Sequence, residues 1–196
     1  MFESALLDRL SRVHPAVPVV IFGPAVTVLL VSAFEVMAGG AVVAWAAGGY
    51  AFWTLSEYWI HRAVFHFEPE EGLGARFHWI IHGVHHDHPN DPLRLVMPPS
   101  VSIPLGLLFF AGFATVLGTP VAYAFGAGFF VGYLAYDMTH YYLHHGRPTT
   151  RFGKWLRELH MRHHFKDDTK GYGISAPYWD VVFRTPIRRG TREPTA

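Results

Sequence analysis

Four long apolar stretches dominate the chain, and polar residues gather between them and at both ends. The stretches cover about residues 16–38, 41–60, 101–118 and 119–143. Each approaches the roughly 20 residues that an α-helix needs to cross a lipid bilayer. Short uncharged joints, with the sequences AGG and GTP, connect the first stretch to the second and the third to the fourth. The pattern predicts an all-α integral membrane fold with four transmembrane helices in two hairpins, 16–60 and 101–143.

The basic residues predict how these helices are oriented. None of the sixteen Lys and Arg residues lies between Val13 and His61 or between Leu95 and Gly146. Because basic residues concentrate on the cytoplasmic side of membrane proteins, segments 1–15, 61–100 and 144–196 are expected in the cytoplasm. An even number of spans agrees, since it returns both termini to one side. We therefore predict a single membrane domain, 1–196, with its hairpin tips outside and a His-rich helical cap on the cytoplasmic face.

The segment before the first apolar stretch has a pattern of its own. Phe2, Leu6, Leu10 and Val13 recur at helical spacing, which is typical of a short helix lying in the membrane interface. A frayed tail and a cleaved signal peptide are the alternatives, and the acidic Glu3 is unusual for a signal peptide. We expect an interfacial segment over residues 1–15.

The composition narrows the chemistry that this membrane domain can carry. A net charge of +1 gives no electrostatic basis for binding nucleic acid. The lack of Cys in the sequence excludes disulfides, iron–sulfur clusters and cysteine-ligated zinc. Against this background the chain has fourteen His residues. A metal ion bound here must therefore be held by imidazole or carboxylate.

Ten of the His residues form two matching sets. Each set is a pair at the end of a predicted membrane helix, followed sixteen residues later by an HxxHH motif. The first set is His61, His66, His82, His85 and His86, and the second is His140, His144, His160, His163 and His164. This internal repetition indicates that the ten imidazoles share one role.

Helical geometry gives the spacing a meaning. Residues at i, i+3 and i+4 share one face of an α-helix, so each HxxHH motif directs three imidazoles the same way, and His140 and His144 do likewise. The pair His61 and His66 differs, because residues five apart lie about 140° apart on a regular helix. Either the helix ends between them, or they reach a site from different sides.

The predicted topology brings all four His motifs to the cytoplasmic edge of the membrane. Ten imidazoles are too many for one ion, so two metal ions sharing them is the natural number. Neutral imidazole binds Fe, Zn, Cu or Ni, and ligand type alone does not choose among them. Surface or packing positions are expected for His14, His88 and His145. His78, four residues before His82, could face the site, and we expect it to support a ligand or to pack there and not to bind metal.

Two acidic residues accompany the His pairs inside the predicted membrane helices. Glu57 lies one turn before His61, and Asp137 lies three residues before His140. A carboxylate at membrane depth costs about 2.5–3.5 kcal/mol on insertion scales, so each needs a partner. One interpretation is that each accepts the distal N–H of a metal-binding His and fixes its tautomer. The alternative is an internal hydrogen bond that only orders the end of the helix.

The series HxxxxH, HxxHH, HxxxH and HxxHH resembles that of the fatty acid hydroxylase/sterol desaturase superfamily, which consists of integral membrane di-metal oxygenases. The flanking blocks EYWIHRAVFHFEP, HGVHHDHPNDPLRLVMPP, YDMTHYYLHHG and KGYGISAPYWDVVF are similar to those of its fatty acid 2-hydroxylase branch. The resemblance runs from about Trp53 to Phe183, and together these motifs are highly specific.

The resemblance implies an O₂-dependent hydroxylase that acts on the α-carbon of a long acyl chain, free or in a sphingolipid-like or other membrane lipid. It implies four membrane helices under a cytoplasmic helical cap, with the ten His residues above binding the metals. The expected cofactors are two iron ions, although zinc can occupy such sites in purified protein. O₂ is the expected co-substrate.

The sequence differs from that branch in its expected source of electrons. Eukaryotic members carry a cytochrome b5-like domain ahead of the membrane part, whereas about fifteen residues precede the first apolar stretch here. We therefore expect a separate donor, either a cytochrome b5-like protein, a ferredoxin or a reductase. A bacterial inner membrane is the expected location, or the endoplasmic reticulum membrane in a eukaryote.

Four other functions compete with acyl hydroxylation. Sterol desaturation and carotenoid ring hydroxylation use similar His series within the superfamily, and the flanking blocks favour the acyl hydroxylase. A metal transporter predicts polar or ionisable residues deep inside several spans, and the first and third stretches have almost none. A non-catalytic zinc-binding membrane protein would differ in its metal and in taking up no O₂.

Overall fold

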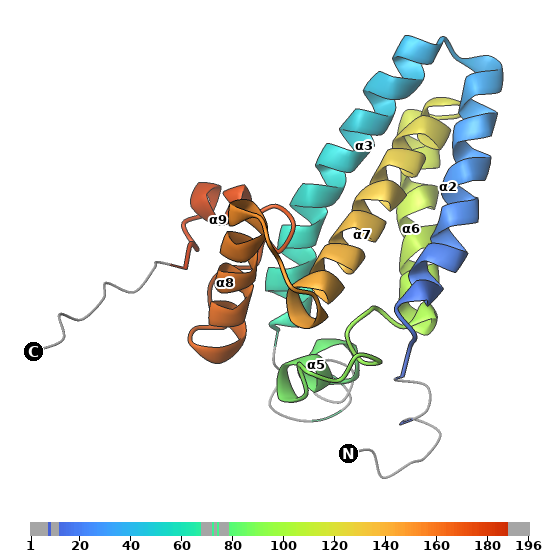
Figure 1. The fold of residues 1–196 in the computed structure, drawn as a ribbon. Helices are drawn as coiled ribbons and strands as arrows, with labels where there is room; N and C mark the ends of the chain where they lie inside the picture. The colour runs from blue at the N-terminus through green and yellow to red at the C-terminus, as the bar shows by residue number, and fades with distance from the viewer. Residues whose placement is uncertain (1–7, 9–11, 68–71, 73, 75–78, 188–196) are drawn as a thin grey trace, which may run out of the picture.

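The computed structural model describes residues 8, 12–67, 72, 74 and 79–187, and all regular structure in this part of the chain is helical. Four long helices run side by side (Figure 1). They are α2 (Ala16–Val36), α3 (Gly39–Ile60), α6 (Pro99–Leu117) and α7 (Val121–His145). Each begins and ends within a few residues of a predicted apolar stretch, so the prediction of four long helices joined in two hairpins is confirmed. Most of the predicted interfacial segment lies outside the described residues.

Shorter elements gather at one end of the bundle, where α3 and α7 end (Figure 1). They are two turns of π-helix, η1 (His61–Phe65) and η2 (Trp79–Gly83), and the helices α5 (Val84–Asp87), α8 (Arg151–Phe165) and α9 (Tyr178–Val182). The side chain of Thr150 begins α8 by accepting a hydrogen bond from Gly153 N at 3.1 Å. All the predicted His motifs therefore lie at one end of the molecule.

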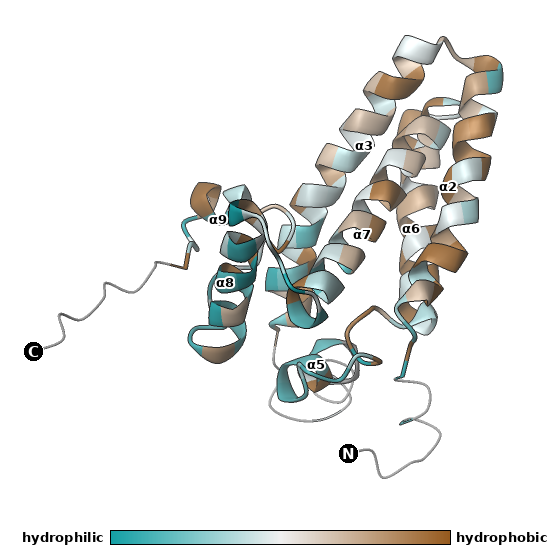
Figure 2. Cartoon of the chain, in the orientation of Figure 1, coloured by the Kyte–Doolittle hydropathy of each residue, from teal (hydrophilic) through white to brown (hydrophobic). Residues whose placement is uncertain are grey.

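The four long helices differ in how apolar they are. By length and composition, α2 and α6 qualify as membrane spans, and they expose apolar side chains such as Val20, Leu108 and Val116. Figure 2 shows hydrophobic residues along the long helices and hydrophilic ones on α5 and α8. The helices α3 and α7 are long enough, but their many small and aromatic residues make them less apolar. Four membrane spans therefore remain a prediction.

Helices α3 and α7 approach each other closely because glycine lies at their contact. A Cβ atom on Gly128 would lie 1.8 Å from the carbonyl oxygen of Ala46, and one on Gly49 would lie 1.9 Å from that of Phe125. Small residues allow backbones to approach in this way in membrane helix pairs. Trp53 packs across the same interface, with ring centroids 5.0 Å from Phe129. This contact fixes the spacing of the helix ends that carry the His pairs.

Replacing Gly128 with Ala tests this contact. The added Cβ has no room beside the Ala46 carbonyl, so α3 and α7 must separate. We expect the substitution to destabilise the fold by about 1–3 kcal/mol, as overpacked sites do, and to lower the thermal midpoint in detergent. Gly112→Ala on α6 is the matched control, because its Cβ would meet nothing within 4 Å. Equal midpoints for the two variants would contradict the close approach.

Candidate metal centre

The pair His61 and His66 is brought together by the π-helical turn η1. In such a turn the backbone closes from residue i to i+5, and His66 N donates to the carbonyl of His61 at 3.1 Å. Residues five apart then lie on the same side, and the two Nε2 atoms are 3.2 Å apart. The regular helix α3 therefore ends here, which is the first of the two options that the sequence left open. The π-helical turn is wider than an α-helical turn, and this width aligns the two imidazoles.

The ten predicted His residues lie in two compact groups of five. The first histidine group is His61, His66, His82, His86 and His163, and the second is His85, His140, His144, His160 and His164. Within each group, one ring nitrogen of every member lies within 4.8 Å of the others. Each HxxHH motif is divided between the two groups, an assignment that the sequence left open. The two groups are therefore neighbours that share the same helices.

The spacing of the ring nitrogens fits ligands of a common ion. Neighbouring Nε2 atoms within the groups are 2.7–3.2 Å apart. Two imidazole nitrogens about 2.1 Å from one ion and at right angles to each other are about 3.0 Å apart. The donor set is nitrogen only, which suits transition metals better than Ca²⁺ or Mg²⁺. Each group could therefore hold one metal ion.

Backbone carbonyls fix the orientation of two imidazoles in the first group. His61 Nδ1 donates to the carbonyl oxygen of Tyr172 at 2.7 Å, and His163 Nδ1 donates to that of Lys170 at 2.7 Å. Because a carbonyl can only accept, the proton of each neutral ring resides on Nδ1. The Nε2 lone pair is then free to bind a metal, which is the usual arrangement around ligand histidines.

Burial keeps the imidazoles neutral. His82, His85 and His160 are each less than 5 % exposed. Burial first, and the neighbouring imidazoles second, lower the pKa of all three side chains well below the ordinary value. Near pH 7 the groups therefore present neutral rings, which is the form that binds metal.

The two acidic residues do not make the contact with imidazole that the sequence suggested. Both carboxylate oxygens of Glu57 accept from Ser175, one from its backbone N at 2.7 Å and one from its hydroxyl. Asp137 is 1 % exposed, and the described part of the chain shows no imidazole N–H donated to it. The direct carboxylate–imidazole contact is thus wrong for Glu57, whose role is to hold the loop that contains Ser175.

Sequence reasoning missed the loop 170–175 and the residue that secures it. Asp180, from α9, accepts from Tyr172 N, Gly173 N and the hydroxyl of Thr185, each at 2.9 Å. Through Tyr172 this network reaches His61. The block KGYGISAPYWD carried the signal, since it combines small residues with one Asp, but which backbone N–H groups Asp180 would meet depends on the folded loop.

Three of the remaining His residues belong to neither group. His14 is exposed and accepts a hydrogen bond from Ala16 N at 3.2 Å. Neither His88 nor His145 belongs to either group. His78 lies outside the described residues.

Known proteins are similar to this chain in both sequence and fold. A family model described as fatty acid hydroxylase matches residues 46–185. Two relatives from Arabidopsis thaliana are named dihydroceramide fatty acyl 2-hydroxylases. One, FAH1, is 44% identical over 74% of this chain and 62% of its own length, and the other, FAH2, is 40% identical over 94% and 78%.

A solved structure adds the fold to this comparison. It is described as full-length scs7p with only the hydroxylase domain visible, and it superposes with a TM-score of 0.91 at 34% identity, over 96% of this chain and 72% of that one. The chain spans about six-tenths of one of its curated relatives. Because the family model covers most of the sequence, including all ten His residues of the two groups, this chain belongs to the fatty acid hydroxylase family.

Proposed function

We propose that this protein is an O₂-dependent membrane hydroxylase that places a hydroxyl group on the 2-position of a long acyl chain, either free or in a sphingolipid-like or other membrane lipid. The observation that carries the proposal is the pair of five-imidazole groups at the end of an apolar helical bundle. The relatives' names, which specify fatty acyl 2-hydroxylation, supply the substrate class and the position.

The ten imidazoles are the proposed metal ligands, with one ion in each histidine group. We propose that iron is the catalytic metal and that zinc can occupy the same sites in purified protein. Two redox-active ions would supply the reduction of O₂ and the attack on an unactivated C–H bond, which zinc cannot do.

The chain's own residues prepare the site. The carbonyls of Tyr172 and Lys170 hold the proton on Nδ1 of His61 and His163 and so aim their Nε2 atoms. Asp180 and Glu57 hold the loop that supplies the Tyr172 carbonyl. Burial excludes water from most of these rings, which keeps them neutral and limits side reactions.

The reaction requires electrons from outside the site. Hydroxylation inserts one oxygen atom of O₂ and releases the other as water, so it consumes two electrons and two protons. The sequence has no Cys to hold an iron–sulfur cluster. We propose a separate donor, which is a cytochrome b5-like protein, a ferredoxin or a reductase.

The proposed membrane arrangement has four spans, α2, α3, α6 and α7, in one domain. The apolar surfaces of α2 and α6 and the distribution of basic residues support it. Hairpins 16–60 and 101–143 cross the bilayer, and segments 1–15, 61–100 and 144–196 lie on the cytoplasmic face of a bacterial inner membrane, or of the endoplasmic reticulum in a eukaryote.

His163→Ala tests the site. Removing one member of the first histidine group should release an ion and abolish lipid hydroxylation, to below about one-hundredth of wild type, because a metal site rarely tolerates loss of a ligand. The readouts are product by lipid mass spectrometry and metal per chain. His88→Ala, outside both groups, should retain both. Full activity in His163→Ala would count against the assignment.

Acid should destabilise the metal-free protein. The folded-state pKa of His82, His85 and His160 is lowered, so below about pH 6.5, the ordinary pKa, the unfolded chain binds protons that the folded chain excludes. The free energy of unfolding is therefore at its full value above this pH and decreases as the pH falls. We expect the thermal midpoint in detergent to decrease between about pH 7.5 and 5.5. A midpoint that stays constant over this range would mean that the rings are not buried as neutral groups.

Single cysteines test the topology, since the natural chain has none. Gly40→Cys at the start of α3, where a Cβ meets nothing within 4 Å, and Thr119→Cys in the α6–α7 joint should react with an impermeant maleimide on intact cells. Lys154→Cys on α8 is the matched control and should react only after lysis. The opposite pattern would overturn the orientation.

A further inference from the structure

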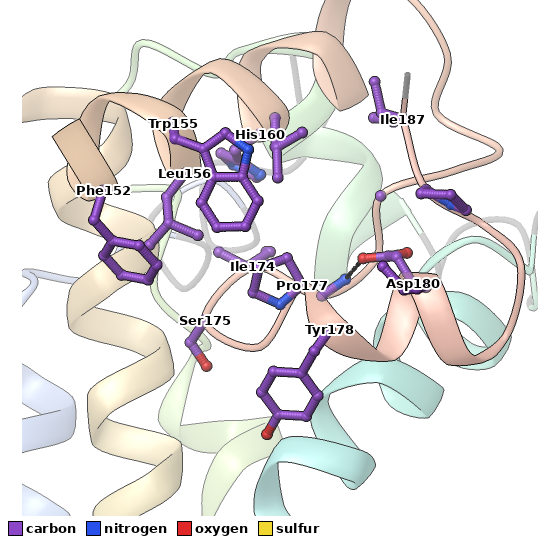
Figure 3. A pocket seen from close by; sticks show the side chains of 15 residues that line it. Phe152, Trp155, Leu156, His160, Ile174, Ser175, Pro177, Tyr178, Asp180 and Ile187 are labelled. Carbon is purple, nitrogen blue, oxygen red and sulfur yellow. Dashed lines mark hydrogen bonds between the residues drawn. The ribbon is translucent and has the colours of Figure 1, made fainter. Parts of the chain in front are cut away.

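An apolar pocket of about 500 Å³ lies between α8, α9 and the loop that joins them. Phe152, Trp155 and Leu156 line it from α8, and Ile174 and Tyr178 line it from the opposite side (Figure 3). Its size is within the range of small-molecule sites, which are mostly apolar. Neither metal binding by the histidine groups nor the hydrogen bonds of the loop gives this pocket a role.

Two of the polar residues that line the pocket, Ser175 and Asp180, are already engaged. Ser175 donates to Glu57 through both its backbone N and its hydroxyl. The Asp180 carboxylate accepts from Tyr172 N, Gly173 N and Thr185 (Figure 3 draws one of these bonds). Most of the remaining lining is aliphatic and aromatic surface, which suits a hydrocarbon chain better than a polar head group.

One end of the pocket reaches the second histidine group. His160 lines the pocket, and its Nε2 lies 2.7 Å from that of His144 and 3.1 Å from that of His164. A molecule that fills the pocket would thus contact a proposed metal ligand directly.

The wall of the pocket formed by α9 contacts α3, a proposed membrane span. The hydroxyl of Tyr178 and the indole N–H of Trp179 both donate to Thr54 Oγ1, at 2.8 and 3.1 Å. Thr54 lies within α3, seven residues before His61, which is about 10 Å along a helix. Short helix α9 therefore packs beside a proposed membrane span (Figure 1).

Apolar side chains from both walls of the pocket, α8 and α9, are exposed. Phe152 is 61 %, Tyr178 is 52 % and Val181 is 68 % exposed, and all three line the pocket. Aromatic and aliphatic residues exposed at this depth are typical of a surface that contacts lipid.

We propose that this α8–α9 pocket binds the acyl chain of a membrane lipid, which enters sideways from the bilayer past Phe152 and Tyr178 and extends to His160. That the chain is a substrate rests on the proposed function; that it is a lipid chain rests on the lining and the depth of the pocket.

Leu159→Trp tests the proposal by filling the pocket, which Leu159 lines. Met161→Trp is the matched control, since Met161 lies two positions along α8 and lines a different surface hollow. We expect Leu159→Trp to lower kcat/KM about tenfold or more with metal content unchanged, and Met161→Trp to stay within about twofold. Equal kcat/KM for both variants would overturn the proposal.

A binding measurement keeps the test independent of activity and of how Leu159→Trp folds. Wild-type protein in phosphatidylcholine vesicles is photolysed with a ceramide whose acyl chain carries a diazirine, and the labelled peptides are identified by mass spectrometry. Label on α8 and on residues 171–182, lost in Leu159→Trp and kept in Met161→Trp, supports the pocket. Label confined to α2, α6 or α7 overturns it.

The two measurements separate this proposal from the proposed function. Label in the pocket without 2-hydroxylated product from any lipid would reject the function and support the lipid site. Product formation with label confined to the other helices would support the function and reject the pocket.

Discussion

The structure depends on one constraint, which is that ten neutral imidazoles must lie within bonding distance of two points at the end of an apolar bundle. Neutral rings repel one another little, but protonated rings crowded within 4.8 Å would not remain together. The fold meets the constraint by burying the rings and by giving the distal nitrogens of His61 and His163 carbonyl acceptors. A metal ion at each point would accept the nitrogen lone pairs that face one another in the protein alone.

The rest of the molecule serves this arrangement at two levels. Close packing of α3 on α7, permitted by Gly49 and Gly128, sets the distance between the helix ends. Beyond those ends, Glu57 and Asp180 hold the loop that carries the Tyr172 carbonyl. Glu57 and Asp180 thus act on the backbone of a loop, and through it on an imidazole, instead of contacting the imidazole themselves.

The sequence predicts the repeated large features well and the local geometry poorly. Hydropathy locates the four long helices because each is a long uniform signal, and the repeated spacing identifies all ten His residues of the two groups. The contact of His61 with His66 could not be chosen in advance, since it depends on a π-helical turn that no residue type specifies. Likewise the partner of Glu57 is Ser175, 118 residues away in the chain, and only the fold determines such pairs.

Two histidine-bound metal ions per chain are the central claim, and X-ray absorption at the metal edge measures them most directly. Protein prepared anaerobically should contain about two ions per chain, with a first shell dominated by imidazole nitrogen at about 2.0–2.2 Å. A single ion per chain, or a shell composed mainly of oxygen, would contradict the account.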